Sequence, residues 1–545
     1  MIASHSPIFS LFILINIFVS TPLYASIYDV DQNDIEDALT DGLLILRHEF
    51  GIDGANLTDG ALAPNAALTN PESIASYIND RSLLFDLDGN RSNDALTDGL
   101  LLLRYLFGLS GDSLIQDALG PGATRNNYAE IKAHIDLSNQ REFKSIKRGI
   151  TYGMGGGQPA LSMDDLGVLS GGLKWWYNWR RTPNHSIESS YSKDGFDFVP
   201  MAWGRNFSDA EIRSFLNGHP HVKYLLGFNE PNFQSQANMT PAEAAAEWPR
   251  LEAIAQEYGL KLVSPAVNFS PGGVDIPGTE DDGSPWAYLD AFFEECDGCQ
   301  VDYIAVHGYM RSANAFKAYV EKFERYGKPI WVTEWAAVDG GGAPNLQSQM
   351  SFLSDTTRWL ESNDSVFRYS WFIARSRQGY GQAPFNDILM DNGTLSPLGE
   401  IYTSIPSNDY PYIPEEIIEA EGAHQIQGFV YDQVPAGQTE DFSQSEVSIT
   451  SQNNSAYVEY KIYIEFAGNY HLNLRLSSLT TNTLKVDLNN RNLWSLNLWN
   501  TTSDDPWKTF SSDGVFLGKG NHIVRVYSDG VFAFNWFTIS KSPIN

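Results

Sequence analysis

Short apolar runs alternate with amphipathic segments through the middle of the chain. Between Arg148 and about Ile405 each run has the length of a strand, and segments such as Pro241–Tyr258 place their apolar residues at helical spacing. The eight apolar runs lie near residues 149–153, 172–178, 198–203, 223–228, 260–266, 301–306, 329–333 and 367–372. Eight strand–helix units in about 250 residues are typical of a (β/α)8 barrel. We therefore predict a TIM barrel over residues 148–405.

A pattern that occurs twice precedes this barrel. The sequence Asp-x-Asp-x-Asn of residues 29–33 returns 57 residues later, at residues 86–90. Each copy continues through Asp-Ala-Leu-Thr-Asp-Gly into an apolar stretch with helical spacing, which ends at Phe50 or Phe107. A repeat of this length indicates one supersecondary unit used twice. We predict a duplicated α-helical module over residues 26–140.

Helical spacing disappears after residue 405. Residues 406–414 hold three prolines among serine, asparagine, aspartate and tyrosine, which is typical of a linker. Apolar and polar residues then alternate, for example over residues 456–464, 470–476, 483–488 and 522–527. Such alternation indicates strands with one buried face. An antiparallel β-sandwich of the jelly-roll type is expected over residues 415–541.

The first 25 residues are typical of a secretory leader. Phe9–Val19 is an apolar stretch too short to span a bilayer, and the small residue Ala25 precedes polar, acidic sequence. We predict a signal peptide over residues 1–25 and export to an extracellular or periplasmic location. No later stretch of sequence is long and apolar enough to predict a transmembrane helix.

Net charge narrows the set of partners. Acidic residues number 67 and basic residues 36, which gives a formal net charge of −31. A polyanion of this size is repelled by nucleic acid and by anionic membranes, so neither is expected as a partner. The excess of acid also fits simple solubility, although part of it follows a metal-ligand pattern.

The chain has two cysteines, Cys296 and Cys299, separated by two residues. In a cytosolic protein this spacing fits a redox pair or half of a zinc site, but no second pair completes a zinc site here. In an exported chain a small disulfide loop is the better interpretation. So short a loop constrains little of the unfolded chain.

Two glutamates stand where predicted barrel strands end. Glu230 closes the fourth apolar run, and Glu334 closes the seventh. Active sites of these barrels are built at the carboxyl ends of the strands. A retaining glycosidase needs two carboxyl groups about 5–5.5 Å apart, one as acid/base and one as nucleophile. A single glutamate would more often be a cap or an ion-pair partner, but two at such ends favour catalysis.

Five segments of the barrel occur in a characteristic order. They are Trp176–Trp179, Phe198–Gly204, Gly227–Asn232, Thr333–Trp335 and Leu395–Gly399. Together they resemble glycoside hydrolase family 128, the β-1,3-glucanases of the retaining clan A, over residues 148–405. The resemblance implies that Glu230 is the general acid/base, that Glu334 is the nucleophile, and that catalysis needs no cofactor.

The same resemblance implies roles for neighbouring side chains. Asn229 would hydrogen-bond the 2-hydroxyl of the sugar, a contact that strengthens in an oxocarbenium-like transition state. His307 and Tyr309 would orient Glu334 or line the subsite where cleavage occurs. Three tryptophans would stack on sugar rings, namely Trp179, Trp203 and Trp371. Packing into the core is the alternative for these tryptophans.

The acidic N-terminal repeats resemble dockerin-like calcium modules, whose loops follow EF-hand logic. Calcium prefers oxygen ligands, which such loops supply at alternating positions. The expected ligands are Asp29, Asp31, Asn33, Asp37 and Asp41 in one loop, and Asp86, Asp88, Asn90, Asp94 and Asp98 in the other. The closing acids, Asp41 and Asp98, fall at the thirteenth position instead of the twelfth. The alternative to a partner-binding module is a spacer that calcium holds together.

Motifs at both ends of the predicted sandwich carry a further resemblance. Ile418–Glu421 lies at its start, and Gly520–His522 and Phe534–Phe537 lie near its end. These resemble a family 6 carbohydrate-binding module, which implies that Trp507 and Asn535 line a sugar cleft. A second aromatic of that cleft has no match in residues 445–450, so a purely structural sandwich is the alternative.

The combined interpretation is a secreted, monomeric, retaining endo-β-1,3-glucanase. It would carry an EF-hand-like α-helical calcium module, a (β/α)8 catalytic barrel and a β-sandwich that binds β-glucan. A retaining hydrolase of another β-linked glycan is the first alternative. The second is a glycan-binding protein without catalysis, against which the two glutamates argue.

Overall fold

The computed structural model describes the chain from residue 27 onward. Gaps in the description fall at residues 34, 65, 67, 80, 91, 140–142, 153–160, 270–271, 277–282, 339–343, 377–378, 435–444, 479, 499–505, 542 and 544–545. The leader predicted over residues 1–25 lies outside the described residues. Of the helices that are described, none has the length and apolar character needed to cross a membrane.

Eight parallel strands form the central domain. They are β1 (Arg148–Thr151), β2 (Trp175–Tyr177), β3 (Asp197–Phe198), β4 (Tyr224–Leu226), β5 (Lys261–Val263), β6 (Ile304–Tyr309), β7 (Ile330–Ala336) and β8 (Val366–Trp371). Six pair in the order β3-β2-β1-β8-β7-β6, and β4 pairs with β5. Bridges from Met201 to Leu226 and from Val263 to Tyr303 connect the two groups, so pairing passes around all eight strands. Each strand overlaps one of the eight predicted apolar runs.

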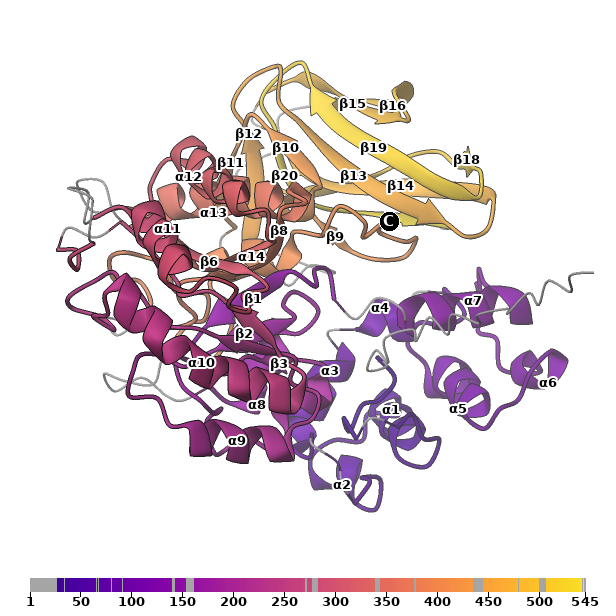
Figure 1. The fold of residues 1–545 in the computed structure, drawn as a ribbon. Coiled ribbons are helices and arrows are strands. Elements are labelled where there is room, and N and C mark those ends of the chain that lie inside the picture. Colours follow the sequence, from indigo (N-terminus) through magenta and orange to yellow (C-terminus); the bar gives the residue numbers. More distant parts are fainter. Residues whose placement is uncertain are drawn as a thin grey trace, which may run out of the picture.

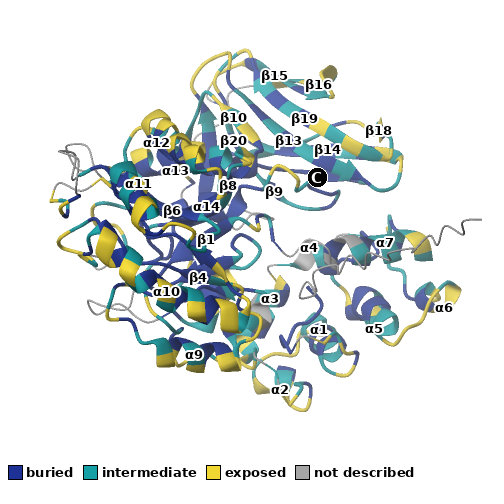
Figure 2. Cartoon of the chain, in the orientation of Figure 1, coloured by how far each residue is buried: buried dark blue, intermediate teal, exposed yellow. Residues whose placement is uncertain are grey.

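Helices surround these strands and expose only their outer faces (Figure 2). They are α8 (Met163–Leu169), α9 (Asp209–Gly218), α10 (Pro241–Tyr258), α11 (Pro285–Glu295), α12 (Ala313–Glu321), α13 (Leu346–Ser362) and α14 (Pro397–Ser404). Sequence determines both ends of α10. Thr240 and Glu243 form a reciprocal capping box with Pro241 in the first turn, and Gly259 ends the helix in a left-handed conformation.

The N-terminal part is helical, as the duplicated pattern predicts. It comprises α1 (Asp41–Glu49), α2 (Ala55–Thr58), α3 (Pro71–Asn79), α4 (Ser82–Phe85), a π-helical turn (Ala95–Gly99), α5 (Leu100–Leu106), α6 (Asp112–Ile115) and α7 (Tyr128–Asn139). The two copies pack on each other reciprocally. A β-carbon added to Gly42 would lie 3.0 Å from Leu103, and one added to the equivalent Gly99 would lie 2.9 Å from Leu46. These glycines therefore allow α1 and α5 to approach closely.

The C-terminal part is an antiparallel sandwich of two sheets (Figure 1). One sheet has the order β10 (Gln425–Gln427), β13 (Tyr457–Ile464), β19 (Gly520–Ser528), β15 (Asn482–Leu488) and β16 (Arg491–Leu498). The other has the order β11 (Phe429–Gln433), β12 (Val447–Ser451), β20 (Ala533–Ser540), β14 (Gly468–Ser477) and β17 (Lys508–Ser511), with β9 (Ile418–Glu419) on β20 and β18 (Val515–Leu517) on β14. Residues of β13 alternate between half-buried and buried, as the sequence pattern indicates.

The sandwich is docked on the central domain instead of being held by a loose linker. Tyr412, inside the predicted linker 406–414, is 3% exposed and donates a hydrogen bond to the carbonyl of Gly422 (2.7 Å). Arg358 of α13 donates to the carbonyls of Glu421 (2.5 Å) and Ala423 (2.8 Å). These contacts join α13 to the turn between β9 and β10 of the sandwich, so the two domains pack directly on each other.

The N-terminal module touches both other parts. Arg81 donates to the hydroxyl of Ser170 in the central domain at 3.0 Å. Lys541, after the last sandwich strand, donates to the carbonyl of Thr124 at 3.1 Å and pairs with Glu130 at 3.3 Å. The module thus lies beneath the sandwich and beside the strands of the central domain (Figure 1).

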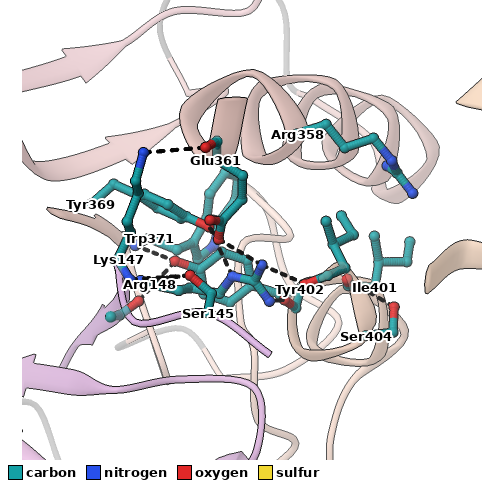
Figure 3. Close-up of polar contacts among 12 residues, drawn as sticks. Ser145, Lys147, Arg148, Arg358, Glu361, Tyr369, Trp371, Ile401, Tyr402 and Ser404 are labelled. Carbon is teal, nitrogen blue, oxygen red and sulfur yellow. Dashed lines mark hydrogen bonds and ion pairs between the residues drawn. The ribbon is translucent and has the colours of Figure 1, made fainter. Parts of the chain in front are cut away.

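A buried ion pair connects β1 to the helices behind it (Figure 3). The guanidinium of Arg148 and the carboxylate of Glu361 lie 3.0 Å apart, with side chains 0% and 1% exposed. Arg148 also donates to the Tyr369 hydroxyl (2.9 Å) and to the Ile405 carbonyl (2.5 Å). Every charge here is matched, because an unpaired ion at this depth would be costly.

Replacing Glu361 with glutamine is expected to lower the free energy of unfolding by about 3–5 kcal/mol, because it leaves the Arg148 cation buried without its counter-ion. Urea unfolding of the full chain measures this change. The matched control is Glu257→Gln, which breaks the exposed pair between Arg213 and Glu257 and should change the free energy of unfolding far less, because solvent screens this pair. Equal losses for the two variants would contradict the role given to the buried pair.

Candidate active site

Glu230 and Glu334 reach the same point from opposite parts of the central domain. Glu334 is part of β7, which is buried at all seven positions. Glu230 follows β4, with a backbone φ of +43° and its N–H bonded to the Ala266 carbonyl (2.9 Å). This left-handed conformation is uncommon for a glutamate and directs the side chain away from the strand path. Both side chains are nearly buried, at 6% and 5% exposure.

The two carboxylates are close to each other and to one histidine. An oxygen of Glu230, an oxygen of Glu334 and a ring nitrogen of His307 all lie within 4.8 Å of one another. Nδ1 of His307 is 2.9 Å from Oε1 of Glu230 and 3.4 Å from Oε2 of Glu334. His307, which was predicted to orient Glu334 or to line the cleaving subsite, therefore contacts both carboxylates.

Three aromatic side chains donate hydrogen bonds to Glu334. Its Oε1 accepts from Trp179 Nε1 (2.6 Å) and from the Tyr177 hydroxyl (3.2 Å), and its Oε2 accepts from the Tyr309 hydroxyl. Burial raises the pKa of Glu334, and the Glu230 charge adds to this effect, whereas His307 and the donated hydrogen bonds act in the opposite direction. Donors on both oxygens stabilise the ionised form of this carboxylate.

Glu230 has a different set of neighbours. Its Oε1 accepts from His307 and, at 3.4 Å, from the amide of Asn268. Within the described residues no donor bonds its other oxygen, Oε2. Two carboxylates this close do not readily ionise together, and the pair is expected to share one proton. Glu334 thus accepts hydrogen bonds on both carboxylate oxygens, whereas Glu230 accepts them on one.

His307 is fully buried, and both carboxylates affect its pKa. Burial opposes its charged form, but the charges of Glu334 and Glu230 and the hydrogen bond to Glu230 outweigh that effect and raise the pKa of His307. A cationic ring in this position would favour a negative charge on either carboxylate. Asn229 lies beside this group, is 4% exposed, and leaves its side-chain oxygen without a hydrogen-bond partner among the described residues.

The same three residues have the spacing of a metal site, but their donors fit proton chemistry better. A carboxylate offers about four lone-pair positions, and three on Glu334 already accept hydrogen bonds. A cation at this point would displace these donors. The arrangement brings together two carboxylates and a histidine that contacts both of them.

Comparisons with known proteins agree with this chemistry. Residues 154–402, which include both glutamates, match the family model for a glycosyl hydrolase catalytic core. The solved family 128 endo-β-1,3-glucanase of Sorangium cellulosum is 38% identical, over 48% of this chain and 99% of that one, with a TM-score of 0.42. This identity over nearly the whole length of a relative decides the family. The chain belongs to glycoside hydrolase family 128.

Two further relatives extend the comparison. A family 128 endo-β-1,3-glucanase of Amycolatopsis mediterranei, solved with laminaritriose, is 28% identical over 48% of this chain and 99% of that one, with a TM-score of 0.38. Alkali-sensitive linkage protein 1 of Schizosaccharomyces pombe is 28% identical over 267 residues, or 48% of this chain and 45% of that protein. The present chain thus spans less than half the length of this curated relative.

The tryptophans predicted to stack on sugar have different positions in the family 128 domain. Trp179 is half-buried, and Trp203 is 38% exposed; both line a cavity of about 650 Å³ together with Arg180, Arg205 and Phe207. Trp371 was predicted to stack as well, but it is fully buried, packs edge-on against Trp335 at 4.5 Å and donates to the Asn386 carbonyl. Trp371 therefore presents no open ring face and belongs to the core.

The C-terminal module differs from its predicted family. Residues 433–539 match the model for a family 35 carbohydrate-binding module, which replaces the family 6 assignment. The two predicted cleft residues are also buried: Trp507 is 8% exposed, and Asn535 is 2% exposed with its amide bonded to the Val447 carbonyl (2.9 Å). Asn535 therefore stabilises the sandwich, and neither side chain forms an open sugar surface in this structure.

The acidic repeats form two equivalent clusters. In each copy, three buried carboxylates place one oxygen each within 4.8 Å of the others: Asp29, Asp31 and Asp41 in the first, and Asp86, Asp88 and Asp98 in the second. Burial raises the pKa of Asp41 and of Asp98 to about 6. A site that offers only oxygen ligands matches the ligand preference of calcium.

Two other predicted calcium ligands, Asp37 and Asp94, are not among these carboxylates. Asp37 and Asp94 are exposed and accept hydrogen bonds from the backbone N–H of Leu39 and of Leu96. Each therefore caps the turn before a helix through one carboxylate oxygen. Asn33 and Asn90 accept from the N–H groups of residues 35 and 92 and so stabilise the loops.

Several residues of the site were not found in the sequence analysis. The Tyr177 hydroxyl donates a hydrogen bond to Glu334, and the Asn268 amide contacts Glu230. The side-chain amide of Asn232 donates to the backbone carbonyl of Asn268 at 2.6 Å. Asn232 follows Glu230 by two residues, and this closeness in the sequence could have predicted that Asn232 belongs to the site. Cys296 and Cys299 form a disulfide at the end of α11, away from these groups.

Proposed function

We propose that the protein is a retaining endo-β-1,3-glucanase, with Glu230 as acid/base and Glu334 as nucleophile. The observation that carries this proposal is the approach of the two carboxylates to within 4.8 Å. Retaining glycosidases hold their carboxyl groups about 5–5.5 Å apart, whereas inverting enzymes leave about 6.5–9.5 Å for a water molecule. The close approach of the two carboxylates here supports the retaining class.

The hydrogen bonds support the division of roles. Ionised Glu334 would attack the anomeric carbon as the bond to the leaving oxygen breaks, and the proton of Glu230 would pass to that oxygen. Ionised Glu230 would then take a proton from water, which attacks the anomeric carbon and releases Glu334. Tyr177, Trp179 and Tyr309 would orient the nucleophile throughout.

The family supports the substrate class. Family 128 contains endo- and exo-acting β-1,3-glucanases, and the relatives from Sorangium cellulosum and Amycolatopsis mediterranei are endo-acting. Product analysis on laminarin, curdlan and mixed-linkage glucan tests the proposal. Early release of oligosaccharides of many lengths would support endo action, release of a single short product would overturn it, and no cleavage of β-1,3-linkages would overturn the substrate.

The remaining proposals concern the flanking modules and export. We propose that each acid cluster of the N-terminal module holds one Ca²⁺, which neutralises carboxylates that would otherwise repel one another. We propose that the family 35-like sandwich binds glucan, in keeping with the polysaccharide substrate.

We also propose that residues 1–25 direct export. Mass spectrometry of the mature chain tests export: a chain that starts at Met1 would contradict removal of a leader.

Removing calcium with EDTA is expected to speed proteolysis within residues 27–139 and to leave the central domain intact. The reason is that three buried carboxylates in each cluster lose their counter-charge. Limited proteolysis with and without EDTA measures the effect. The double variant Asp41→Asn/Asp98→Asn should lose the response, whereas the control Asp37→Asn/Asp94→Asn, which changes exposed caps, should keep it. Equal cleavage of the wild type in both conditions would refute calcium dependence.

A further inference from the structure

The loop after β5 presents an exposed aromatic ring. Phe269 is 45% exposed, the most exposed of the large apolar side chains described between residues 148 and 405. A phenylalanine with this exposure loses the stabilisation that burial would give it. Its position therefore calls for a ligand or a packing reason, and the packing is only partial.

Neighbouring rings support one side of Phe269. The Trp286 ring stands edge-on to it at 5.2 Å and 89°, and the Tyr319 ring lies at 5.3 Å and 37°. Trp286 lies in α11 and Tyr319 in α12, the helices that follow β5 and β6. These contacts hold the ring in place and leave part of it open to solvent.

Phe269 lies on the side of the site that belongs to Glu230. Its N–H donates to Oδ1 of Asn268 (2.8 Å), whose amide nitrogen is 3.4 Å from Oε1 of Glu230. Burial raises the pKa of Tyr319, beneath the Phe269 ring, and the Glu230 charge adds to that rise. Trp179, by contrast, bonds Glu334 and lines the 650 Å³ cavity with Trp203.

The chemistry of the two glutamates distinguishes these sides. The nucleophile contacts the sugar that becomes bound to the enzyme, and the acid faces the oxygen that departs with the leaving sugar. We propose that Phe269 is the stacking platform for the first glucosyl residue on the leaving-group side. This inference rests on the proposed function. It adds a residue that favours a sugar as the leaving group when the glycosyl-enzyme forms, and a sugar as the acceptor when the glycosyl-enzyme breaks down by transfer.

The experiment compares two leaving groups in the full-length enzyme. Phe269→Ala should lower kcat/KM about tenfold for laminaritetraose, whose leaving group is a sugar. It should change kcat/KM less than about twofold for 2,4-dinitrophenyl β-laminaribioside, whose leaving group is not a sugar. Added laminaribiose should also capture a smaller share of the glycosyl-enzyme, because the acceptor would bind to the same ring.

Two variants control for indirect effects. Phe269→Tyr keeps the ring and should retain both activities. Phe516→Ala removes a 68% exposed ring on the sandwich and should change neither. Equal losses of Phe269→Ala on both substrates would show a merely structural role and overturn the platform, as would no loss on either. A wild-type enzyme that cleaves the aryl glycoside but no β-1,3-glucan would overturn the proposed substrate instead.

Discussion

Replacing Glu334 with alanine is expected to lower turnover by about four orders of magnitude or more on every substrate, activated or not. The variant has no nucleophile, so no glycosyl-enzyme can form. Loss should be equally severe for laminarin and for a dinitrophenyl glycoside, because a better leaving group does not replace the missing bond to C1. Steady-state kinetics on both substrates measures the effect.

The matched control is Glu321→Ala, which removes an exposed glutamate of α12. That variant should keep wild-type activity. Circular dichroism and thermal unfolding of Glu334→Ala show whether the domain still folds. A folded Glu334→Ala variant with substantial activity on the aryl glycoside would contradict the assignment of the nucleophile.

Replacing Glu230 with alanine is expected to separate the two chemical steps. With laminarin, kcat/KM should fall by about 10²–10⁴-fold, the contribution of a general acid. With a dinitrophenyl glycoside the first step should survive, because this leaving group needs little protonation. The glycosyl-enzyme should then accumulate, since no base activates water, and azide should restore turnover because it needs no base.

The configuration of the azide product identifies each residue. In Glu230→Ala, azide attacks the glycosyl-enzyme and should give the β-glycosyl azide. In Glu334→Ala, azide attacks from the vacated face and should give the α-glycosyl azide. Proton NMR of the isolated azides measures this difference. The opposite pair of products would reverse the two roles.

The barrel was predictable because most positions of its strands are buried. β7 is buried at every position, so it appears in the sequence as an unbroken apolar run that ends near Glu334. In β4, which precedes Glu230, two of the three positions are buried. Strand number and strand ends therefore followed from the pattern, together with the two glutamates that the strand ends bring together.

Residues that act through side-chain direction were not predictable in this way. Tyr177 stands in an aromatic run of β2, and nothing in that run shows that its hydroxyl points to Glu334. The residues next to Trp371 in the sequence do not distinguish an exposed sugar platform from a core residue. In the structure, the rings of Trp335 and Phe352 pack against it. Asn268 meets Glu230 only because β4 and β5 are neighbours in the barrel.

In the two flanking modules, too, the sequence pattern predicted the elements but not the direction of individual side chains. Repetition of the acidic motif predicted two equivalent clusters, and the loops bring the first, third and thirteenth positions of each together. The ninth position was assigned from loop spacing alone, whereas Asp37 and Asp94 instead meet the first N–H groups of a helical turn. In the sandwich, alternation predicted strands, but it did not indicate that Asn535 would turn inward to the Val447 carbonyl.

The configuration of the first product tests the central claim most directly. Proton NMR during the first minutes of laminari-oligosaccharide hydrolysis, at enzyme concentrations that outpace mutarotation, resolves the α- and β-anomeric signals of the new reducing end. Two displacements at C1, first by Glu334 and then by water, predict that the β-anomer appears first and the α-anomer follows by mutarotation. Initial release of the α-anomer would mean a single displacement and would contradict the two-glutamate retaining mechanism.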